Sequence, residues 1–258
     1  MAPRRRDESP RESAGPAACG SSGPGAPRPQ DSAAGADSEL PARLCRACVE
    51  LLDVTGASVS LDAGGGARTT WWSSDEVAGR LAEAQYTLGD GPCGAALRMC
   101  APVLAPDLAQ GPDAHRWPVF AHCAVRLGVR AVFTLPLGSE AAAIGTLDLY
   151  RSRPGPLSEH DLALAFPAAD AITDALVLLS SSSPAGRRAA DGLDTLEWLR
   201  EAETQHEEVH HATGMLMVRW GVPADEALAR LRAHAFAQGT TVTQAARAVV
   251  EKRDGLGH

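Results

Sequence analysis

The chain has 258 residues, of which 45% are hydrophobic and 4% aromatic, and its formal net charge is −8. This length suits one or two folded domains whose cores are built mainly from Ala, Leu and Val. The acidic balance excludes a strongly basic surface over the whole chain, which is the usual first sign of nucleic-acid binding.

The cysteines and apolar stretches indicate the cellular setting. Six cysteines are too few for a disulfide scaffold in a chain of this length. Cys45 and Cys48 form a C-x-x-C pair, but no second pair stands at zinc-ribbon spacing. No apolar run of the roughly 18 residues needed to span a membrane is evident, and no apolar segment follows the Arg-rich N-terminus. The sequence therefore predicts a cytoplasmic protein with no membrane partner.

The chain divides into four segments by composition. Residues 1–37 are Pro, Gly, Ser, Ala and charged residues without apolar periodicity, which predicts a disordered tail. A larger domain is expected over 38–180, a polar linker of small residues over 181–193, and a helical domain over 194–254.

Helix-period and strand-period segments alternate through the larger domain. In chain order they are a helix near 44–52, strands over 57–61 and 68–73 around a Gly-rich turn, helices over 75–84 and 93–99, a Pro-bounded strand within 101–108, a helix within 112–127, strands over 128–138 and 142–151, and a helix over 158–179. Ser158 is a plausible N-cap of the last helix, and Pro167 is expected to kink it. This order predicts an α+β fold, an antiparallel sheet with flanking helices.

Four segments in this order carry a family resemblance: YTLGDGPC, PVLAPDL, GVRAVFTLPL and IGTLDLYRSRPGPLSEHDL. Together they resemble the GAF domain, in particular the GAF sensors of actinobacterial regulators. The resemblance covers about residues 39–179. It implies a small-molecule site between the sheet and its covering loops.

Residues that would line such a pocket are Trp71, Trp72, Cys93, Trp117 and Phe133, with core packing as the alternative for each aromatic ring. Two adjacent tryptophans on a strand point to opposite faces, so at most one of them would face the pocket. The sequence identifies neither the ligand nor a cofactor.

Two further functional interpretations of this domain stay open, a redox-sensitive cysteine and a haem site. Cys93 lies at the expected start of a helix, where its pKa would be lowered and the thiol redox-sensitive, or it is a plain buried thiol. His115 and His122 would be the axial ligands of a haem, although a surface histidine is the commoner case.

The C-terminal segment is predicted to form three helices, so that the α+β domain is followed by a small all-α domain. The first helix is expected over 194–220, and the second starts at Pro223 and stops at Gly239. The third is capped by Thr241 with Gln244 three residues on, which is capping-box spacing. This core is too small for a catalytic cleft, and no Ser-His-Asp order, metal cluster or phosphate loop stands out, so we expect no enzyme.

The segment HATGMLMVRWGVPADEALARLRAHAFAQGTTVTQAARAVV closely resembles the ANTAR domain, an RNA-binding module of transcription antiterminators. The resemblance implies binding to RNA hairpins. Candidate RNA contacts are His210, His211, Arg219, Arg232 and Arg247. Ala212, Gly214 and Ala245 are interpreted as close-packing positions.

The charge of the helical segment keeps other functions open. From residue 194 onward it has ten acidic and seven basic residues, and Thr213 stands where the family often has lysine. A heptad-like seam along 199–220 would join two chains in a homodimer or pack on its own domain. The alternatives to an RNA-binding regulator are a DNA-binding transcription factor and a ligand or redox switch that acts through protein contacts.

Overall fold

The computed structural model describes residues 39–64, 67–139, 142–182 and 207–251. The expected tail over 1–37 and most of the expected linker lie outside the described residues, as does the start of the helical domain over 194–206. The last helix of the larger domain ends at Ser182, so the first two residues expected in the linker are helical.

A five-stranded antiparallel sheet forms the centre of the larger domain, with the order β2-β1-β5-β4-β3. Its strands are β1 (Gly56–Gly64), β2 (Ala67–Ser73), β3 (Val103–Ala105), β4 (Ala131–Ser139) and β5 (Ala142–Arg151). This sheet confirms the predicted α+β fold. The Pro-bounded strand is shorter than expected, with three residues.

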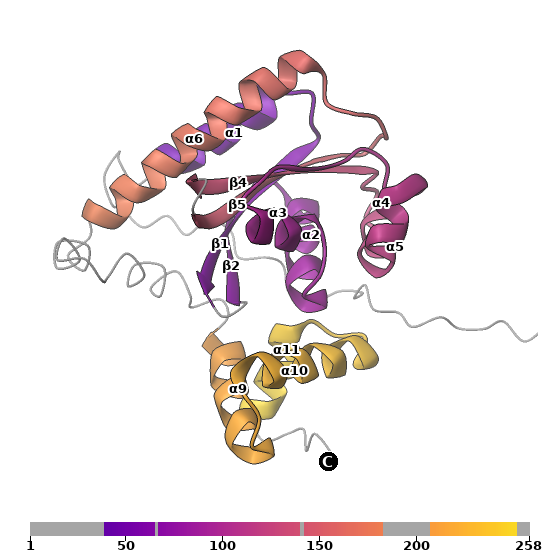
Figure 1. Ribbon diagram of the computed structural model, residues 1–258, viewed down its shortest axis with the longest axis vertical. Coiled ribbons are helices and arrows are strands. Elements are labelled where there is room, and N and C mark those ends of the chain that lie inside the picture. The colour runs from indigo at the N-terminus through magenta and orange to yellow at the C-terminus, as the bar shows by residue number, and fades with distance from the viewer. Residues whose placement is uncertain (1–38, 65–66, 140–141, 183–206, 252–258) are drawn as a thin grey trace, which may run out of the picture.

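One face of the sheet is apolar and is covered by α1 (Leu40–Leu51) and α6 (Glu159–Ser182) (Figure 1). Alternate strand residues point to this face because successive side chains on a strand alternate. They are Ala57, Val59, Leu61, Ala131, Phe133, Leu135, Leu137, Leu147 and Leu149. Ser158 caps α6 as predicted, since its Oγ accepts the Asp161 N–H at 3.0 Å.

Four helices cover the other face of the sheet: α2 (Glu76–Leu88), α3 (Pro92–Met99), α4 (Gly111–Arg116) and α5 (Pro118–Arg126). Asp75 caps α2 and also accepts the Tyr150 hydroxyl at 3.0 Å, which fixes this helix to β5. The single helix expected within 112–127 is wrong. Pro118 disfavours helical backbone at Trp117, which has φ −133° and ψ 66°, so the chain forms two helices.

A β-bulge in β2 changes the orientation of the two tryptophans. Val59 pairs with Trp72 and Ser60 pairs with Thr70, which leaves Trp71 as an extra residue. A bulge interrupts the alternation of side chains. Both Trp71 and Trp72 therefore pack against the core beneath α1 and α6, and the prediction that they point to opposite faces is wrong.

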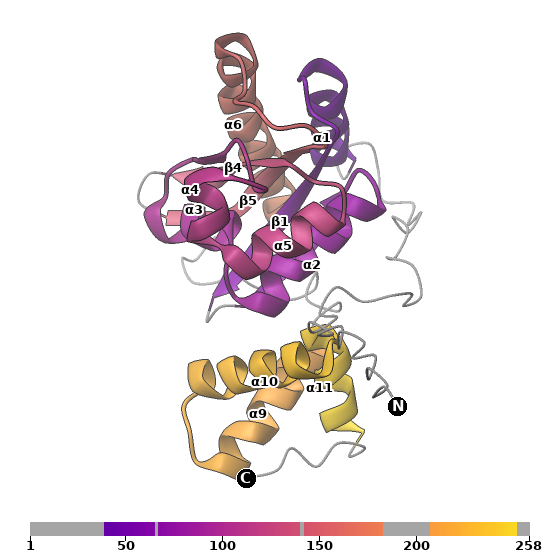
Figure 2. The same ribbon diagram turned by 90° about the vertical axis from the view of Figure 1, so that its right-hand side faces the viewer.

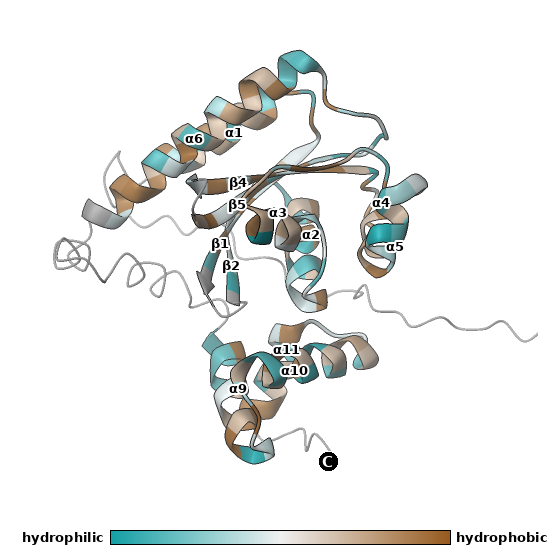
Figure 3. Ribbon diagram, in the orientation of Figure 1, coloured by the Kyte–Doolittle hydropathy of each residue, from teal (hydrophilic) through white to brown (hydrophobic). Residues whose placement is uncertain are grey.

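Helix α6 is more apolar than the sequence analysis allowed. Among the described residues it is the one helix with the length and hydropathy to cross a membrane, over Glu159–Ser180, and 28% of that stretch is buried. Its hydrophobic residues are spread along its length (Figure 3). The core helix of a soluble protein passes the same test, and Ala165, Ile172 and Leu176 of α6 are fully buried against the sheet.

Within the described residues 207–251, the C-terminal domain consists of three helices, as predicted: α9 (Glu207–Trp220), α10 (Ala224–Gln238) and α11 (Val242–Val250). Thr241 and Gln244 make the expected capping box. Gly239 ends α10 in the left-handed conformation, with φ 66°. Val209 and Leu216 of the heptad-like seam are buried in this domain's own core; the earlier part of the seam lies outside the described residues.

Candidate functional site

Five polar side chains are buried on the sheet face that α2 and α3 cover. They are Ser58, Ser60, Thr134, Thr146 and Asp148, all at most 5% exposed. Each alternates along its strand with an apolar residue of the opposite face. Buried polar groups need hydrogen-bond partners, so this face is built for polar contacts.

Arg68 of β2 crosses this face and binds the two covering helices. Its Nη1 donates to Cys93 Sγ at 2.8 Å and its Nη2 donates to the Gln85 carbonyl at 3.3 Å. Gln85 in turn accepts the Cys93 N–H at 2.8 Å through Oε1. Arg68 is 8% exposed, so its charge depends on these partners and on nearby Asp148.

Asp148 of β5 is the acidic member of the network. Its carboxylate accepts from Thr134 Oγ1 at 2.5 Å and from Gln85 Nε2 at 3.4 Å. Burial raises the pKa of Asp148 to about 6, although these donors and Arg68 oppose the rise. Asp148 is therefore mainly ionised at pH 7 and offsets the charge of Arg68.

Cys93 is a plain buried thiol. Burial, followed by the charge of Asp148, raises its pKa to about 11, which agrees with the buried-thiol alternative and not with a pKa lowered at a helix N-terminus. Its Sγ also lies 3.0 Å from Thr146 Oγ1. Cys45 and Cys48 are likewise free and buried, and burial raises the pKa of Cys48 to about 11. Thiols that stay protonated react slowly with oxidants.

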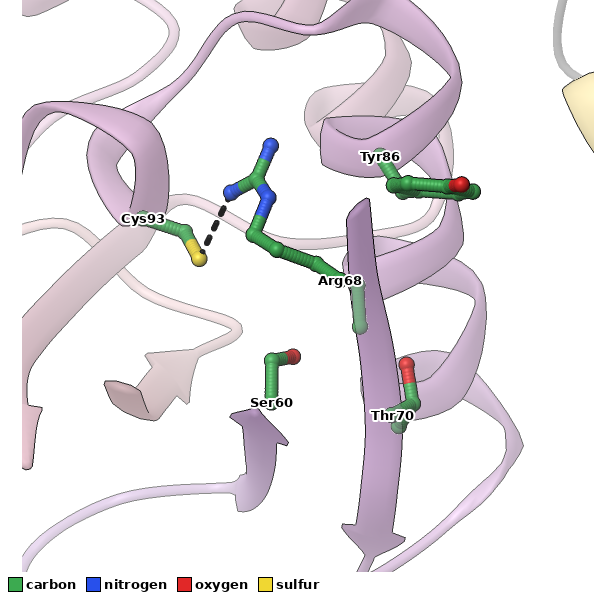
Figure 4. A pocket seen from close by; sticks show the side chains of 6 residues that line it. Ser60, Arg68, Thr70, Tyr86 and Cys93 are labelled. Atoms are coloured by element: carbon green, nitrogen blue, oxygen red, sulfur yellow. Dashed lines mark hydrogen bonds between the residues drawn. The ribbon is translucent and has the colours of Figure 1, made fainter. Parts of the chain in front are cut away.

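A small cavity opens beside this network. Ser60, Arg68, Thr70, Ala82, Tyr86 and Cys93 line it, with side chains from β1, β2, α2 and α3 (Figure 4). Its volume is about 10 Å³, which is room for about one water molecule. Pockets for drug-sized ligands have roughly 300–1,000 Å³. A small molecule therefore fits here only when the lining side chains move, and it would then meet the hydrogen-bond donors of the guanidinium and the hydroxyls.

The structure does not bring the five predicted pocket residues together. Cys93 lines the cavity. Phe133 lies on the opposite, apolar face of the sheet with Trp71 and Trp72, while Trp117 is buried among α2, α4 and α5. The remaining cavity residues were missed. The sequence signal for this face is the alternating Ser and Thr of the strand segments ASVSL, FTLPL and GTLDLY.

Neither histidine considered for haem points into the core. His115 and His122 are both exposed, and His115 Nδ1 lies 2.6 Å from the Gly111 carbonyl. Within the described part of the chain, no group of three or more His, Cys, Asp or Glu side chains is placed to hold a metal ion.

The five candidate RNA contacts fall on different surfaces of the helical domain. His210, His211 and Arg219 are exposed on α9. Arg247 of α11 is exposed and pairs with Glu208 at 2.9 Å. Arg232 of α10 instead contacts the larger domain, where its Nε donates to the Tyr86 carbonyl at 3.0 Å.

The close-packing interpretation holds for two of three small residues. Ala212 and Ala245 are buried, at 0% and 5% exposed. Gly214 is exposed in the middle of α9, and a Cβ added there would meet nothing within 4 Å. Packing within the described chain therefore gives no reason for a glycine at this position.

Several solved structures are similar to part of the chain at low sequence identity. A sensor histidine kinase domain from Sinorhizobium meliloti has 18% identity and a TM-score of 0.43, covering 55% of this chain and 92% of its own. A GAF domain region from Geobacter sulfurreducens has 13% identity and a TM-score of 0.44, and the match covers 55% of this chain and 95% of that one. A free methionine-R-sulfoxide reductase from Thermoplasma acidophilum has 15% identity and a TM-score of 0.38, and the match covers 55% of this chain and 94% of that one. No curated protein sequence matches the chain.

Two family models match the chain. The GAF domain model matches residues 38–177, which is more than half of the chain. The ANTAR domain model matches residues 197–250. GAF domains are sensor domains and ANTAR domains are regulatory ones. The chain therefore belongs to the GAF domain family and, with its ANTAR domain, is a regulator that joins a sensor to an output domain.

Proposed function

We propose that the chain is a signal-responsive transcription regulator that binds structured RNA through its ANTAR domain and promotes antitermination under the control of its GAF domain. The match of residues 197–250 to the ANTAR domain carries this proposal. The GAF domain responds to a small molecule that binds beside Arg68, where the side chains that line the small polar cavity move to admit it. We further propose a cytoplasmic homodimer, which light scattering on the full chain tests.

The outer face of α9 supports an RNA contact. His210, Gly214 and Val218 follow one another at spacings of four, so they lie on one stripe of the helix. His210 is exposed and Val218 is 87% exposed. His211 lies three residues before Gly214, and Arg219 comes one residue after Val218. The stripe is open and carries no acidic side chain between 210 and 219.

Binding to a paired-hairpin transcript tests the function directly. We expect the full chain to bind a terminator-proximal RNA hairpin more tightly than an unrelated hairpin at moderate salt, with an affinity that falls as salt rises. Gel shifts with duplex DNA of the same sequence test the alternative that the chain binds DNA. Equal affinity for all hairpins, or a preference for the DNA duplex, would overturn the proposal.

Gly214 gives a sharper test of the α9 stripe. A glycine inside a helix costs roughly 1 kcal/mol relative to alanine, so Gly214→Ala is expected to stabilise the ANTAR domain by about that amount. If an RNA backbone approaches Gly214 closely, the added methyl group weakens RNA binding several-fold. Thermal unfolding and RNA titration of the same variant measure both effects. Higher stability with unchanged RNA affinity would remove Gly214 from the contact.

A further inference from the structure

The C-terminal end of α2 holds the ANTAR domain through three side chains: Glu83, Tyr86 and Thr87. We call these three residues the α2 dock. Figures 1 and 2 both show α10 and α11 next to this end of α2. Thr87 Oγ1 accepts the Val242 N–H at 3.1 Å, and Glu83 Oε1 accepts from Thr243 Oγ1 at 3.3 Å.

Tyr86 is a residue of α2 that is buried in the core of the C-terminal domain. It is 3% exposed and is part of the apolar cluster formed by α9, α10 and α11. The Arg232 guanidinium lies over its ring, 5.2 Å from the centroid, while Arg232 Nε donates to its carbonyl at 3.0 Å. Gly89 ends α2 with φ 65°, and a Cβ there would approach Arg232 Nη1 to 3.2 Å, so the glycine also leaves room for the arginine.

The polar part of the α2 dock meets the start of α11. The first N–H groups of a helix lack partners within the helix and carry partial positive charge. Thr87 Oγ1 accepts a hydrogen bond from the Val242 N–H and donates one to Glu83 Oε1 at 3.5 Å. Glu83 and Thr87 thus supply hydrogen-bond acceptors at the start of α11, which favours this docking over an arbitrary packing of two surfaces.

We propose that the α2 dock is an autoinhibitory contact that withholds Arg232 from RNA until the GAF domain receives its signal. The inference rests on the proposed RNA-binding function. Of the five candidate RNA contacts, Arg232 is the one whose guanidinium is committed to the GAF domain. The α9 stripe stays open, so docking weakens RNA binding rather than abolishing it.

Tyr86 links the dock to the cavity. Its side chain lines the cavity together with Ala82 of the same helix, and Arg68 donates to the carbonyl of neighbouring Gln85. Burial lowers the pKa of Arg232, Tyr86 opposes this lowering, and the positive charge of Arg68 adds to it. A ligand that moves Tyr86 or Arg68 therefore changes the contacts that hold Arg232 against α2.

Opening the dock from the GAF side tests the inference without altering the RNA-binding domain. Glu83→Lys places a positive charge against the positive end of α11 and is expected to release it. RNA affinity of the full chain should rise roughly five- to tenfold, as expected when an arginine contact is regained. Glu76→Lys is the matched control, because it makes the same charge change on an exposed position in the first turn of α2. It should leave RNA affinity near the wild-type value.

A chemical lock tests the same contact in the opposite direction. Glu83→Cys with Thr243→Cys places two thiols across the dock, and a short, cleavable, bifunctional thiol-reactive crosslinker joins them. The joined full chain should bind RNA about five- to tenfold more weakly than the same chain after cleavage. The wild-type chain with the same reagent controls for its own cysteines, and circular dichroism checks that each variant folds.

The outcomes separate the inference from the function on which it rests. If Glu83→Lys and Glu76→Lys have the same RNA affinity and the lock has no effect, the autoinhibitory contact is overturned while RNA binding stands. If the wild-type chain, Glu83→Lys and the cleaved lock all fail to bind hairpin RNA, the proposed function itself is overturned, and the inference with it. Amide exchange at Val242 should be faster in Glu83→Lys than in the control.

Discussion

Replacing Arg68 with methionine is expected to lower the free energy of unfolding of the GAF domain by about 3 kcal/mol at pH 7, because it leaves Asp148 as a buried charge without its counter-charge. The variant also removes the donors to Cys93 Sγ and to the Gln85 carbonyl. This is a large fraction of the stability of a typical domain. Urea unfolding followed by tryptophan fluorescence measures it.

The loss should depend on pH in a defined direction. The folded-state pKa of Asp148 is about 6, above its ordinary value of 3.8, so the folded state binds the proton more tightly. Stability therefore falls as pH rises from about 4 to 6 and then levels off. Without Arg68 the pKa rises further, so the deficit of Arg68→Met should be small at pH 5 and largest above pH 7.

A double variant provides the control. Arg68→Met with Asp148→Asn removes both charges, keeps an acceptor for Thr134, and should recover most of the lost stability. If the double variant is as unstable as Arg68→Met alone, the Arg68 side chain matters through packing, and the charge pairing described here is wrong.

Acidification is expected to tighten the α2 dock, so that RNA binding through Arg232 weakens as pH falls. Burial raises the pKa of Glu83 from 4.5 to about 7 in the docked state, although three threonine hydroxyls oppose the rise. Docking then takes up a proton between about pH 4.5 and 7. From these two values, the docking equilibrium tightens about fivefold from pH 7 to pH 6 and changes about twofold from pH 7 to pH 8.

Glu83→Gln isolates this effect from other titrating groups. The carboxyl group of Glu83 accepts hydrogen bonds from the hydroxyl groups of Thr87, Thr241 and Thr243, and these hydroxyl groups do not titrate in this range. The variant retains every other ionisable side chain of the wild type, so a difference between the two profiles comes from position 83. RNA titrations at pH 6, 7 and 8 should show the extra fivefold step in the wild type and lack it in Glu83→Gln. Parallel profiles would contradict the role of Glu83.

The elements of the fold were predictable because their signals are local. Ser158, Thr241 and Gly239 mark helix ends by chemistry that involves only neighbouring residues. The mistakes come from single residues that override a pattern. Pro118 divides one expected helix into two, and the bulge at Trp71 rotates a side chain that simple alternation assigned to the other face.

The candidate site was predictable only in part because its residues meet across the sheet. Arg68 and Cys93 are 25 positions apart, and Thr146 is 53 positions beyond Cys93. The pocket prediction favoured aromatic residues and so included Trp117 and Phe133, which the structure places in two separate apolar cores. The role of Tyr86 depends on Arg232, 146 positions away, and no local pattern reports such a contact.

The alternation along β1, β4 and β5 divides two tasks between neighbouring residues. Val59, Leu135 and Leu147 hold the domain together on one side, while Ser60, Thr134 and Thr146 are presented to the other. Single hydroxyls on this polar face, including that of Ser60 in the cavity lining, can therefore be exchanged without touching the apolar core. Under the proposed function, a GAF domain built in this way can change the molecule it recognises during evolution while its apolar core remains the same.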